Sequence, residues 1–315
     1  WMIKKGIILA GGKGTRMSPL TKAVNKQLLP IYDKPLIFYP LSILMLANIK
    51  DILIIVNKGQ LNQYKKILPN GINLGIKISY AEQKKPKGLP DAFILGEKFI
   101  GKDNVALILG DNFFYGQNLT SQLLGNTKLS NGAKIMLHKV IKPELYGVAK
   151  INKNNKVVLI KEKPKKFISD LAITGLYFFD KKVVEYTKKL KPSARNELEI
   201  TDLNRSYLDE NRLRVEHFGR GYAWLDAGTE EDLLEASNFI ATFERRQGIR
   251  IGCIEEVAWR MGWISASELN TLGLKLANST YGKYLMKLAS EFHLLRYYQV
   301  EYLHEVCLLI FLKKL

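Results

Sequence analysis

The sequence is poor in cysteine and histidine. Its 315 residues include two cysteines, Cys253 and Cys307, and four histidines. Neither cysteine belongs to a Cys-x-x-Cys pair or lies in a histidine-rich stretch, which argues against a disulfide scaffold and a structural zinc site. So few thiols fit a reducing compartment, and we expect a cytoplasmic location.

Long hydrophobic runs are also missing. The longest run near the C-terminus covers residues 306–312, far short of the roughly 20 residues that a membrane span requires. The apolar run at 7–10 is too short for the core of a signal peptide and leads directly into glycines. We therefore expect no membrane insertion.

Negative charge is scarce, because 48 Lys and Arg residues face 30 Asp and Glu residues, for a net charge of +18. With 47% hydrophobic residues, the chain still has the composition of a globular protein with a sizeable core. The lysines are spread along the chain without a helix-turn-helix or basic-aromatic signature. This pattern favours a lysine-rich solvated surface over a nucleic-acid groove, and it is compatible with small anionic substrates.

Apolar runs alternate with helical patterns over the first 110 residues. Strands are predicted at residues 3–10, 51–56, 76–80 and 105–109, and helices at 36–48, 60–67 and 91–100. Such alternation predicts an α/β protein with a doubly wound, mostly parallel sheet. Extra short strands at 134–140, 157–161 and 173–179 should extend or cap the sheet, and helical periodicity follows from residue 229.

The chain shows no long linker, low-complexity tract or internal repeat. We predict a main domain over residues 1–248 and a helical C-terminal appendage over 249–315, which packs on the body or at a subunit interface. The last part of that appendage, residues 292–315, has apolar side chains on too many sides for a solvated helix. It should therefore be covered, and we expect its role to be structural.

A glycine-rich segment follows the first predicted strand and reads GGKGTRMSP at 11–19. Glycines let backbone N–H groups wrap an anion, and Arg16 offers a fixed-charge fork for phosphate oxygens. The segment lacks the third glycine of a dinucleotide fingerprint and the closing Gly-Lys-Ser/Thr of a Walker A loop. Together with Lys26, it predicts a triphosphate site rather than a tight turn with solvated charges.

Two aspartates, at positions 111 and 226, are candidate metal ligands. Asp111 comes directly after the strand at 105–109, where open α/β sheets bind ligands, and Asp226 lies in WLDAGT at 224–229. Magnesium on a nucleotide takes one or two carboxylates plus phosphate oxygens and water, so this pair is a candidate metal site. The alternative is a turn residue at 111 and a helix-start charge at 226, ahead of the cap Thr229.

Further motifs extend this pattern. They are KQLLP at 26–30, YPLS at 39–42, LGDN at 109–112, YGV at 146–148, EKP at 162–164, TGLY at 174–177, ELEITD at 197–202 and GRGYAWLD at 219–226. With GGKGTR at 11–16, they resemble the motifs of the glucose-1-phosphate thymidylyltransferase family of sugar nucleotidyltransferases, over residues 4 to about 289. The glycine motif is shared by nucleotidyltransferases of several sugars, whereas the ELEITD and GRGYAWLD motifs are far narrower.

This resemblance implies a Rossmann-like nucleotide-diphospho-sugar transferase fold and a Mg²⁺-dependent enzyme. Such an enzyme transfers a deoxythymidylyl group from dTTP to glucose 1-phosphate, giving dTDP-glucose and pyrophosphate. The reaction is the first step towards dTDP-rhamnose and related sugars of surface polysaccharides such as lipopolysaccharide O-antigen. The resemblance also implies a homotetramer and feedback inhibition by dTDP-rhamnose in a region that here contains Arg220, Glu255, Glu256 and Arg260.

The family motifs also imply roles for individual residues. The nucleotide would be bound by Gly11, Gly12, Gly14, Thr15, Arg16, Lys26, Gln83, Gly88 and Asp111, with Gln83 and Gly88 on the thymine. The sugar phosphate would be bound by Asn112, Gly147, Glu162, Lys163, Ile173 and Arg195. Asp111 and Asp226 would hold Mg²⁺, and the catalytic residues would be Arg16, Lys26, Asp111, Lys163 and Asp226.

The sequence departs from the family pattern at three places. Met17 stands where Leu is common, Asn196 interrupts the usual Arg-Gly-Glu, and Pro90-Asp91 replace a frequent Ala-Gln.

The expected chemistry follows from charge, because a sugar phosphate must attack a triphosphate that is also negative. Its phosphate oxygen is already ionised at neutral pH, so we expect direct in-line displacement without a general base or a covalent intermediate. Three alternatives stay open: use of UTP or another sugar phosphate, a ligand sensor without activity, and a basic nucleic-acid-binding protein. The first is realistic because one methyl group in an apolar pocket discriminates by only about 1–3 kcal/mol.

Overall fold

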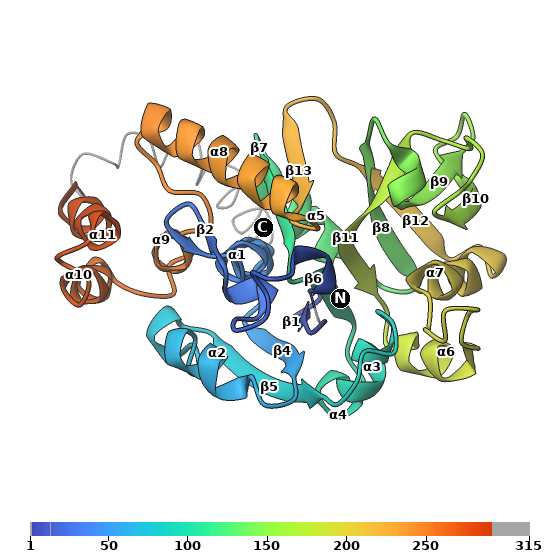
Figure 1. Cartoon of the computed structure of the whole chain (residues 1–315), viewed down its shortest axis with the longest axis horizontal. Helices are drawn as coiled ribbons and strands as arrows, with labels where there is room; N and C mark the ends of the chain where they lie inside the picture. Colours follow the sequence, from blue (N-terminus) through green and yellow to red (C-terminus); the bar gives the residue numbers. More distant parts are fainter. Residues whose placement is uncertain (1, 13, 292–315) are drawn as a thin grey trace, which may run out of the picture.

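The centre of the molecule is a nine-stranded sheet, seen in a computed structural model that describes residues 2–12 and 14–291 (Figure 1). Strand β1 (Lys5–Ala10) lies between β4 (Asp51–Asn57) and β6 (Val105–Leu109), and β4 pairs with β5 (Lys77–Gln83). These four strands are parallel. They are rich in Ile, Leu and Val because helices cover the sheet on both faces.

The other half of the sheet is mixed. Strand β11 (Leu171–Phe179) runs antiparallel to β6 and also pairs with β8 (Ala133–Lys139) and β9 (Gly147–Ile151). Strand β10 (Val157–Glu162) extends β9, and β12 (Leu213–His217) is parallel to β8. The predicted α/β class with extra strands is confirmed, although β9 and β12 were not predicted.

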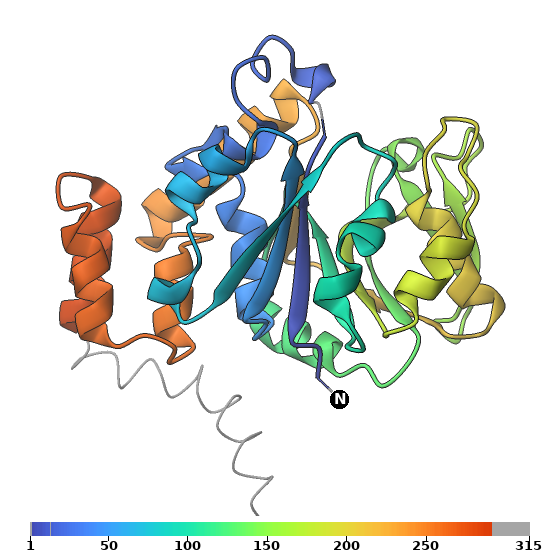
Figure 2. The ribbon, with the colours of Figure 1, turned by 90° about the horizontal axis from the view of Figure 1, so that it is seen from below.

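Helices lie on both sides of the sheet (Figure 2). On one face α1 (Phe38–Leu46), α2 (Leu61–Ile67) and α5 (Leu119–Thr127) share an apolar core with alternate sheet residues such as Ile8. On the other face α3 (Asp91–Leu95), α4 (Glu97–Ile100), α6 (Val183–Lys189) and α7 (Ile200–Asp209) cover Ile7 and Leu9. Short 3₁₀ turns occur at Thr15–Met17, Lys26–Leu28, Ile72–Leu74 and Pro143–Leu145.

The single helix predicted over residues 91–100 is wrong in detail. The structure has two short helices, α3 and α4, separated at Gly96. A Cβ at this position would lie 2.9 Å from the carbonyl oxygen of Ala92 and 3.0 Å from the Ile7 side chain. The chain thus packs closely against β1 where the helix is interrupted.

A separate two-stranded ribbon follows β6, an interior strand of the main sheet. Strand β7 (Asn112–Gly116) follows β6 almost directly and pairs antiparallel with β13 (Tyr222–Asp226). The register places Asp226 opposite Asn112. Helix α8 (Glu230–Gln247) packs on this ribbon through a third apolar core that includes Phe113 and Ile240. Residues 111 and 226 are therefore brought together by strand pairing.

The C-terminal helices lie at one end of the molecule (Figure 1). Helix α9 (Ile254–Arg260) joins the core beside α1, while α10 (Ala266–Leu274) and α11 (Thr280–Ser290) form a helical hairpin further out. The division at residue 248 stays a prediction, and residues 292–315 lie outside the described part. No helix in the described ranges combines the length and apolarity needed to cross a membrane.

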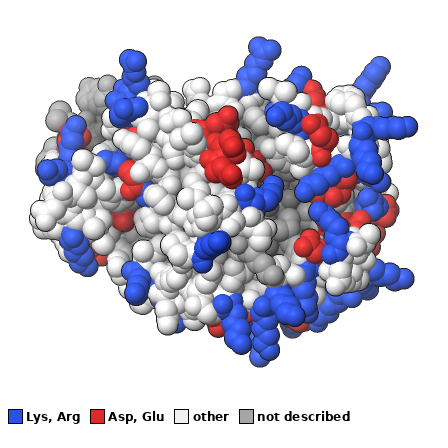
Figure 3. All heavy atoms as spheres, in the orientation of Figure 1, with Lys and Arg blue, Asp and Glu red and all other residues white. Residues whose placement is uncertain are grey.

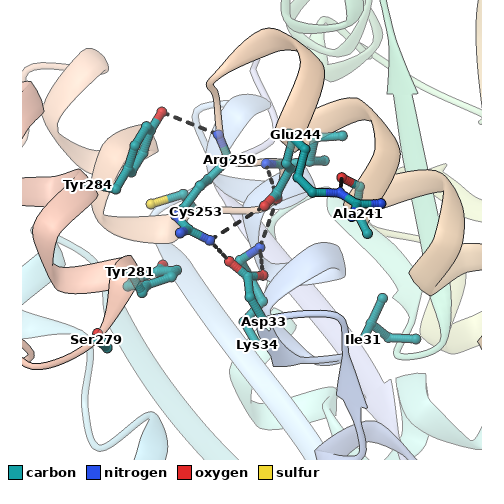
Figure 4. A network of polar contacts seen from close by, with 12 residues as sticks. Ile31, Asp33, Lys34, Ala241, Glu244, Arg250, Cys253, Ser279, Tyr281 and Tyr284 are labelled. Atoms are coloured by element: carbon teal, nitrogen blue, oxygen red, sulfur yellow. Dashed lines mark hydrogen bonds and ion pairs between the residues drawn. The ribbon is translucent and has the colours of Figure 1, made fainter.

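A buried set of charges joins the β2–β3 hairpin to the end of α8 and the segment before α9 (Figure 4). We call Asp33, Lys34, Glu244 and Arg250 the hairpin cluster, because the first two lie on the hairpin of β2 (Pro30–Ile31) and β3 (Lys34–Pro35). Lys34 Nζ lies 3.1 Å from Glu244 Oε1 and also pairs with Asp33. Arg250 pairs with the same two carboxylates, with 3.5 Å between its Nη1 and Glu244 Oε2.

Candidate active site

A cleft of about 410 Å³ opens where β1 and β6 end. It is lined by residues from the glycine segment, one end of the β7–β13 ribbon and the loops of the second half of the fold. A smaller recess of about 210 Å³ adjoins it and shares Gly11, Gly12, Arg16 and Asp111 with it. The carboxyl ends of parallel strands are where open α/β sheets bind ligands.

The glycine segment is held open by its own backbone and by Asn57. Gly12 has a φ of 117° and Gly14 a φ of 58°, conformations that favour glycine. Asn57, at the end of β4, accepts a hydrogen bond from the Gly12 N–H (2.9 Å) and donates to the Gly12 carbonyl (2.7 Å). Asn57 was not predicted from the sequence, where its only signal was a polar residue at the end of a buried strand.

Thr15 and Arg16 line the recess on the first 3₁₀ turn. The guanidinium of Arg16 is exposed and forms no ion pair with any other residue of the described ranges. It is therefore available to an anion. Lys13 lies outside the described residues.

Lys26 and Asp111 form a close pair at the bottom of the recess. Asn25 caps the turn that carries Lys26, because its Oδ1 accepts from the Gln27 N–H (2.9 Å) and from the Tyr64 hydroxyl (2.8 Å). Lys26 is 8% exposed, and its Nζ lies 2.6 Å from Asp111 Oδ2. The ammonium is thereby fixed at the point where the cleft and the recess meet.

Asp226 lies beside Asp111 through the register of the ribbon, and the Ala227 N–H donates to the Asp111 carbonyl (3.0 Å). Its Oδ1 accepts a hydrogen bond from the Tyr146 hydroxyl (3.0 Å). Burial and the neighbouring Asp111 charge raise the pKa of Asp226 to about 6, although Tyr146 and Lys26 oppose the shift. We call Lys26, Asp111 and Asp226 the carboxylate corner.

The corner has the donor set of a nucleotide-bound metal rather than of a protein-enclosed one. No group of three or more metal-binding side chains occurs among residues 2–12 and 14–291. Of the two carboxylates, Asp111 is the one that pairs with the Lys26 ammonium, so a divalent cation would relieve the excess negative charge. Its remaining ligands would be phosphate oxygens and water, as is common for Mg²⁺.

The side expected to bind the base is formed by β5 and the loop after it. Gln83, at the end of β5, is 4% exposed and packs against Gly11. Gly88 has a φ of 99° and forms a parallel β-bridge with Leu198, and the Leu198 N–H donates to the Lys87 carbonyl (2.8 Å). A Cβ on Gly88 would overlap the Leu198 backbone. Gly88 thus joins the two walls of the cleft.

The side expected to bind the sugar phosphate is lined by Gly147, Glu162, Lys163, Ile173 and Arg195. Glu162 Oε2 accepts from the Thr201 hydroxyl (2.5 Å). Arg195 forms two hydrogen bonds with Glu199, Nε to Oε1 (3.2 Å) and Nη2 to Oε2 (2.7 Å). The polar groups on this side are therefore held in place by their neighbours.

The chain is similar to proteins of a known family. A model of the nucleotidyl transferase family matches residues 5–242. A glucose-1-phosphate thymidylyltransferase of Neisseria meningitidis serogroup A/serotype 4A is 53% identical over 284 residues, which is 90% of this chain and 99% of the relative. The chain belongs to the glucose-1-phosphate thymidylyltransferase family of nucleotidyl transferases.

Other relatives and solved structures are also similar to the chain. Relatives with the same name from Xanthomonas campestris pv. campestris (strain B100) and Mycobacterium tuberculosis (strain H37Rv) are 51% and 48% identical, and the alignments cover 91% and 90% of this chain and 97% and 98% of theirs. A solved thymidylyltransferase structure from Bacillus anthracis has a TM-score of 0.69 at 42% identity, covering 75% of this chain and 94% of that one. A UDP-glucose pyrophosphorylase complexed with UDP-glucose has a TM-score of 0.68 at 29% identity, covering 78% and 100%.

Two residues in the site motifs of this nucleotidyltransferase, Lys163 and Asn196, are among the non-glycine residues with positive φ. Lys163 has a φ of 40°, and its N–H donates to the Tyr146 carbonyl (3.0 Å). Non-glycine residues with positive φ are uncommon and often occur at functional sites. Asn196 has a φ of 59°, a conformation that Asn tolerates better than most residues. Asn196 can therefore replace the family's glycine without changing the path of the loop.

The four residues expected to take part in regulation lie on two segments. Glu255, Glu256 and Arg260 are on α9, where Arg260 Nε donates to Glu256 Oε1 (2.7 Å). Burial raises the pKa of Glu255, which accepts a hydrogen bond from Tyr281. Arg220 is in the exposed turn between β12 and β13.

Tyr146 and Trp224 are site residues to which the sequence analysis gave no role. Both line the cleft, and their rings lie 5.2 Å apart. Tyr146 contacts Asp226, whereas the Trp224 indole N–H is directed at Asn112. The only sequence signal for them was their place inside two quoted motifs, YGV and GRGYAWLD.

Proposed function

We propose that this nucleotidyltransferase joins dTTP and glucose 1-phosphate to give dTDP-glucose and pyrophosphate. A phosphate oxygen of the sugar attacks the α-phosphorus, and the bond from that phosphorus to the pyrophosphate oxygen breaks. The observation that carries this proposal is the carboxylate corner beside an open glycine segment. The names of the relatives, each 48–53% identical to the chain, supply the substrates.

On the nucleotide side, Gly11, Gly12, Gly14 and Thr15 would surround the triphosphate. Arg16 has no competing partner within the described residues, so its guanidinium can meet charge that develops on the pyrophosphate. Lys26 would hold a phosphate oxygen near the α-phosphorus, while Gln83 and Gly88 would contact the base. Asp111 and Asp226 would hold Mg²⁺, and the ion would supply charge neutralisation for the phosphates.

On the sugar-phosphate side, Lys163 and Arg195 would offset the charge of glucose 1-phosphate. Glu162, with Gly147 and Ile173, would contact the sugar hydroxyls. Lys and Arg side chains are frequent over the part of the surface where β9, β10 and α7 lie (Figure 3). Such a field draws anionic substrates towards the cleft.

The substrates can be tested by measuring pyrophosphate release across a matrix of nucleoside triphosphates and sugar 1-phosphates. We expect the highest kcat/KM for dTTP with glucose 1-phosphate. The second candidate is UTP, which the likeness to a UDP-glucose pyrophosphorylase favours. A kcat/KM for UTP above that for dTTP would overturn the nucleotide assignment and leave the reaction class in place.

Kinetic measurements can distinguish residues that act on the nucleotide from residues that bind the sugar phosphate. Arg16→Ala should lower kcat more than it raises KM for dTTP, because its contact strengthens in the transition state. Lys163→Ala should chiefly raise KM for glucose 1-phosphate. Lys165→Ala is the matched control, since Lys165 is exposed two positions further on and does not line the cleft. An effect of Lys163→Ala on dTTP alone would contradict its assignment.

We also infer the cellular setting from family membership. The enzyme is expected to be a cytoplasmic homotetramer that starts the route to dTDP-rhamnose for surface polysaccharides. dTDP-rhamnose would act as a feedback inhibitor at Arg220, Glu255, Glu256 and Arg260. Light scattering tests the tetramer, and inhibition curves of Arg260→Ala against wild type test the feedback site.

A further inference from the structure

The side chain of Asn112, on β7, makes hydrogen bonds to β13, to β11 and to the carboxylate of Asp111. It is 2% exposed, and its Oδ1 accepts hydrogen bonds from the Trp224 indole N–H (2.6 Å) on β13 and the Gly175 N–H (3.0 Å) on β11. Its Nδ2 donates to Asp111 Oδ1 (2.9 Å). Side-chain amides with one buried acceptor and one buried donor contact are rarely free to rotate.

These contacts fix which end of the amide faces Asp111. Trp224 and the Gly175 backbone are both donors, so the oxygen of Asn112 must point at them and the nitrogen at the carboxylate. Asp111 Oδ2 is held separately by Lys26 at 2.6 Å. Both oxygens of Asp111 therefore have a fixed partner, and the plane of the carboxylate is set from two sides.

We propose that Asn112 is a positioning residue, which orients Asp111 for the divalent cation. This inference rests on the proposed metal role of Asp111. Residues that hydrogen-bond to a metal ligand orient it and raise its affinity for the metal, and their loss typically weakens binding about 10–100-fold.

Gly175 provides the space that this arrangement needs. A Cβ at position 175 would lie 2.6 Å from Asn112 Cγ and 2.8 Å from Nδ2. Gly175→Ala should therefore push the amide away from Asp111 without removing a polar group. Trp224→Phe is a milder change, because it deletes one of the two donors and keeps an aromatic ring.

The test is direct Mn²⁺ binding, followed by electron paramagnetic resonance of free Mn²⁺, with no substrate present. We expect the dissociation constant to rise about tenfold or more in Asn112→Ala and Gly175→Ala, and less in Trp224→Phe. Asn126→Ala is the matched control, because Asn126 is also 2% exposed but lies on α5, outside the cleft lining.

The Asp111→Asn variant distinguishes failure of the positioning role of Asn112 from failure of the proposed metal site. If Asp111→Asn weakens Mn²⁺ binding and the Asn112 and Gly175 variants do not, the positioning role is wrong. Unchanged Mn²⁺ binding in Asn112→Ala with a raised KM for glucose 1-phosphate would make Asn112 a substrate contact. If Asp111→Asn itself binds Mn²⁺ like wild type, the metal assignment of the proposed function fails. Should Asn112→Ala not fold, Trp224→Phe provides the same readout.

Discussion

The carboxylate corner and the hairpin cluster are built from the same kinds of side chain and differ in balance. The hairpin cluster pairs two carboxylates with two cations, and Lys34 and Arg250 each contact both Asp33 and Glu244. The corner has two carboxylates and one ammonium, and it borders a cleft of about 410 Å³. Buried charge alone thus does not indicate a binding site, whereas unbalanced charge that a ligand can reach does indicate one.

Burial affects the two groups in different ways. In the hairpin cluster it lowers the pKa of Lys34 and raises that of Glu244, which shows that desolvation outweighs their mutual attraction. In the corner, burial and Asp111 raise the pKa of Asp226 to about 6. The carboxylate corner thus keeps the ionised side chain of Asp226 in surroundings that disfavour its charge, and such strain at active sites commonly lowers stability.

The largest expected effect is the loss of turnover when the corner loses charge. Asp111→Asn and Asp226→Asn should each lower kcat/KM about a thousandfold or more, equivalent to about 4 kcal/mol, because the amide keeps the shape without the metal-binding charge. Pyrophosphate release at saturating Mg²⁺ measures this. Asp33→Asn is the control from the hairpin cluster and should leave the turnover of folded enzyme nearly unchanged. Equal losses at Asp33 and Asp111 would break the comparison.

Charge loss in the hairpin cluster should instead lower stability and leave the activity of the folded enzyme in place. Lys34→Met should lower the free energy of unfolding by about 3–5 kcal/mol, because Asp33 and Glu244 are then left with one cation between them. Urea unfolding measures this, and the specific activity of the folded fraction should be retained. The double variant Lys34→Met/Glu244→Gln should recover part of the loss. A Lys34→Met protein as stable as wild type would show that the cluster carries no net charge coupling.

The pH dependence of stability tests Asp226 directly. Its carboxyl titrates near pH 6 when folded and at about pH 4 when unfolded, so its stabilising contribution is complete below about pH 4 and is lost as the pH rises through 6. Asp226→Asn, which cannot ionise, should therefore be more stable than wild type above pH 6 by roughly 2–3 kcal/mol. The measurement is urea unfolding from pH 4 to 8 with EDTA.

Asp111→Asn provides the contrast, because it removes the anionic partner of the buried Lys26 ammonium. It should lose about 1–3 kcal/mol at neutral pH. If both Asn variants were less stable than wild type at pH 7, the strain assigned to Asp226 would be absent.

The smallest effect is expected at Asn196, which belongs to neither group of charges. Asn196→Gly should leave stability and activity almost unchanged, because glycine adopts its φ of 59° freely. Asn196→Ala should lower the free energy of unfolding by about 1 kcal/mol, since Cβ disfavours that conformation. Equal stability of the Gly and Ala variants, measured by thermal unfolding, would show that the backbone conformation at 196 is not maintained in solution.

The central sheet could be predicted because its strands are local patterns. Strands β1, β4 and β6 are apolar runs that end at polar or glycine residues, and their burial on both faces makes such runs conspicuous. Strands β7 and β13 were missed. Strand β7 starts one residue after a turn motif, and β13 is half-buried along its length, so neither has the apolar pattern of a core strand.

The candidate site was predicted in part for the same reason. Most residues expected at the site line the cleft or its recess, because their motifs follow strands of the sheet. Asn57 and Tyr146 act on the site through contacts with residues 45 and 80 positions away, which no local spacing shows. Hydrogen bonds of this kind depend on the packed structure and have no signature in sequence.

The β7–β13 ribbon also sets the order in which the site can assemble during synthesis. Asn112 and Trp224, which pair across the ribbon, are 112 positions apart. Asp111, at the end of β6, is therefore synthesised more than a hundred residues before β13. The parallel strands β1, β4, β5 and β6 can pair as soon as they emerge, because chains fold from the N-terminus as they are made. The second carboxylate arrives only with β13. A nascent chain that has folded its sheet therefore still lacks the pair of charges that would retain a divalent cation.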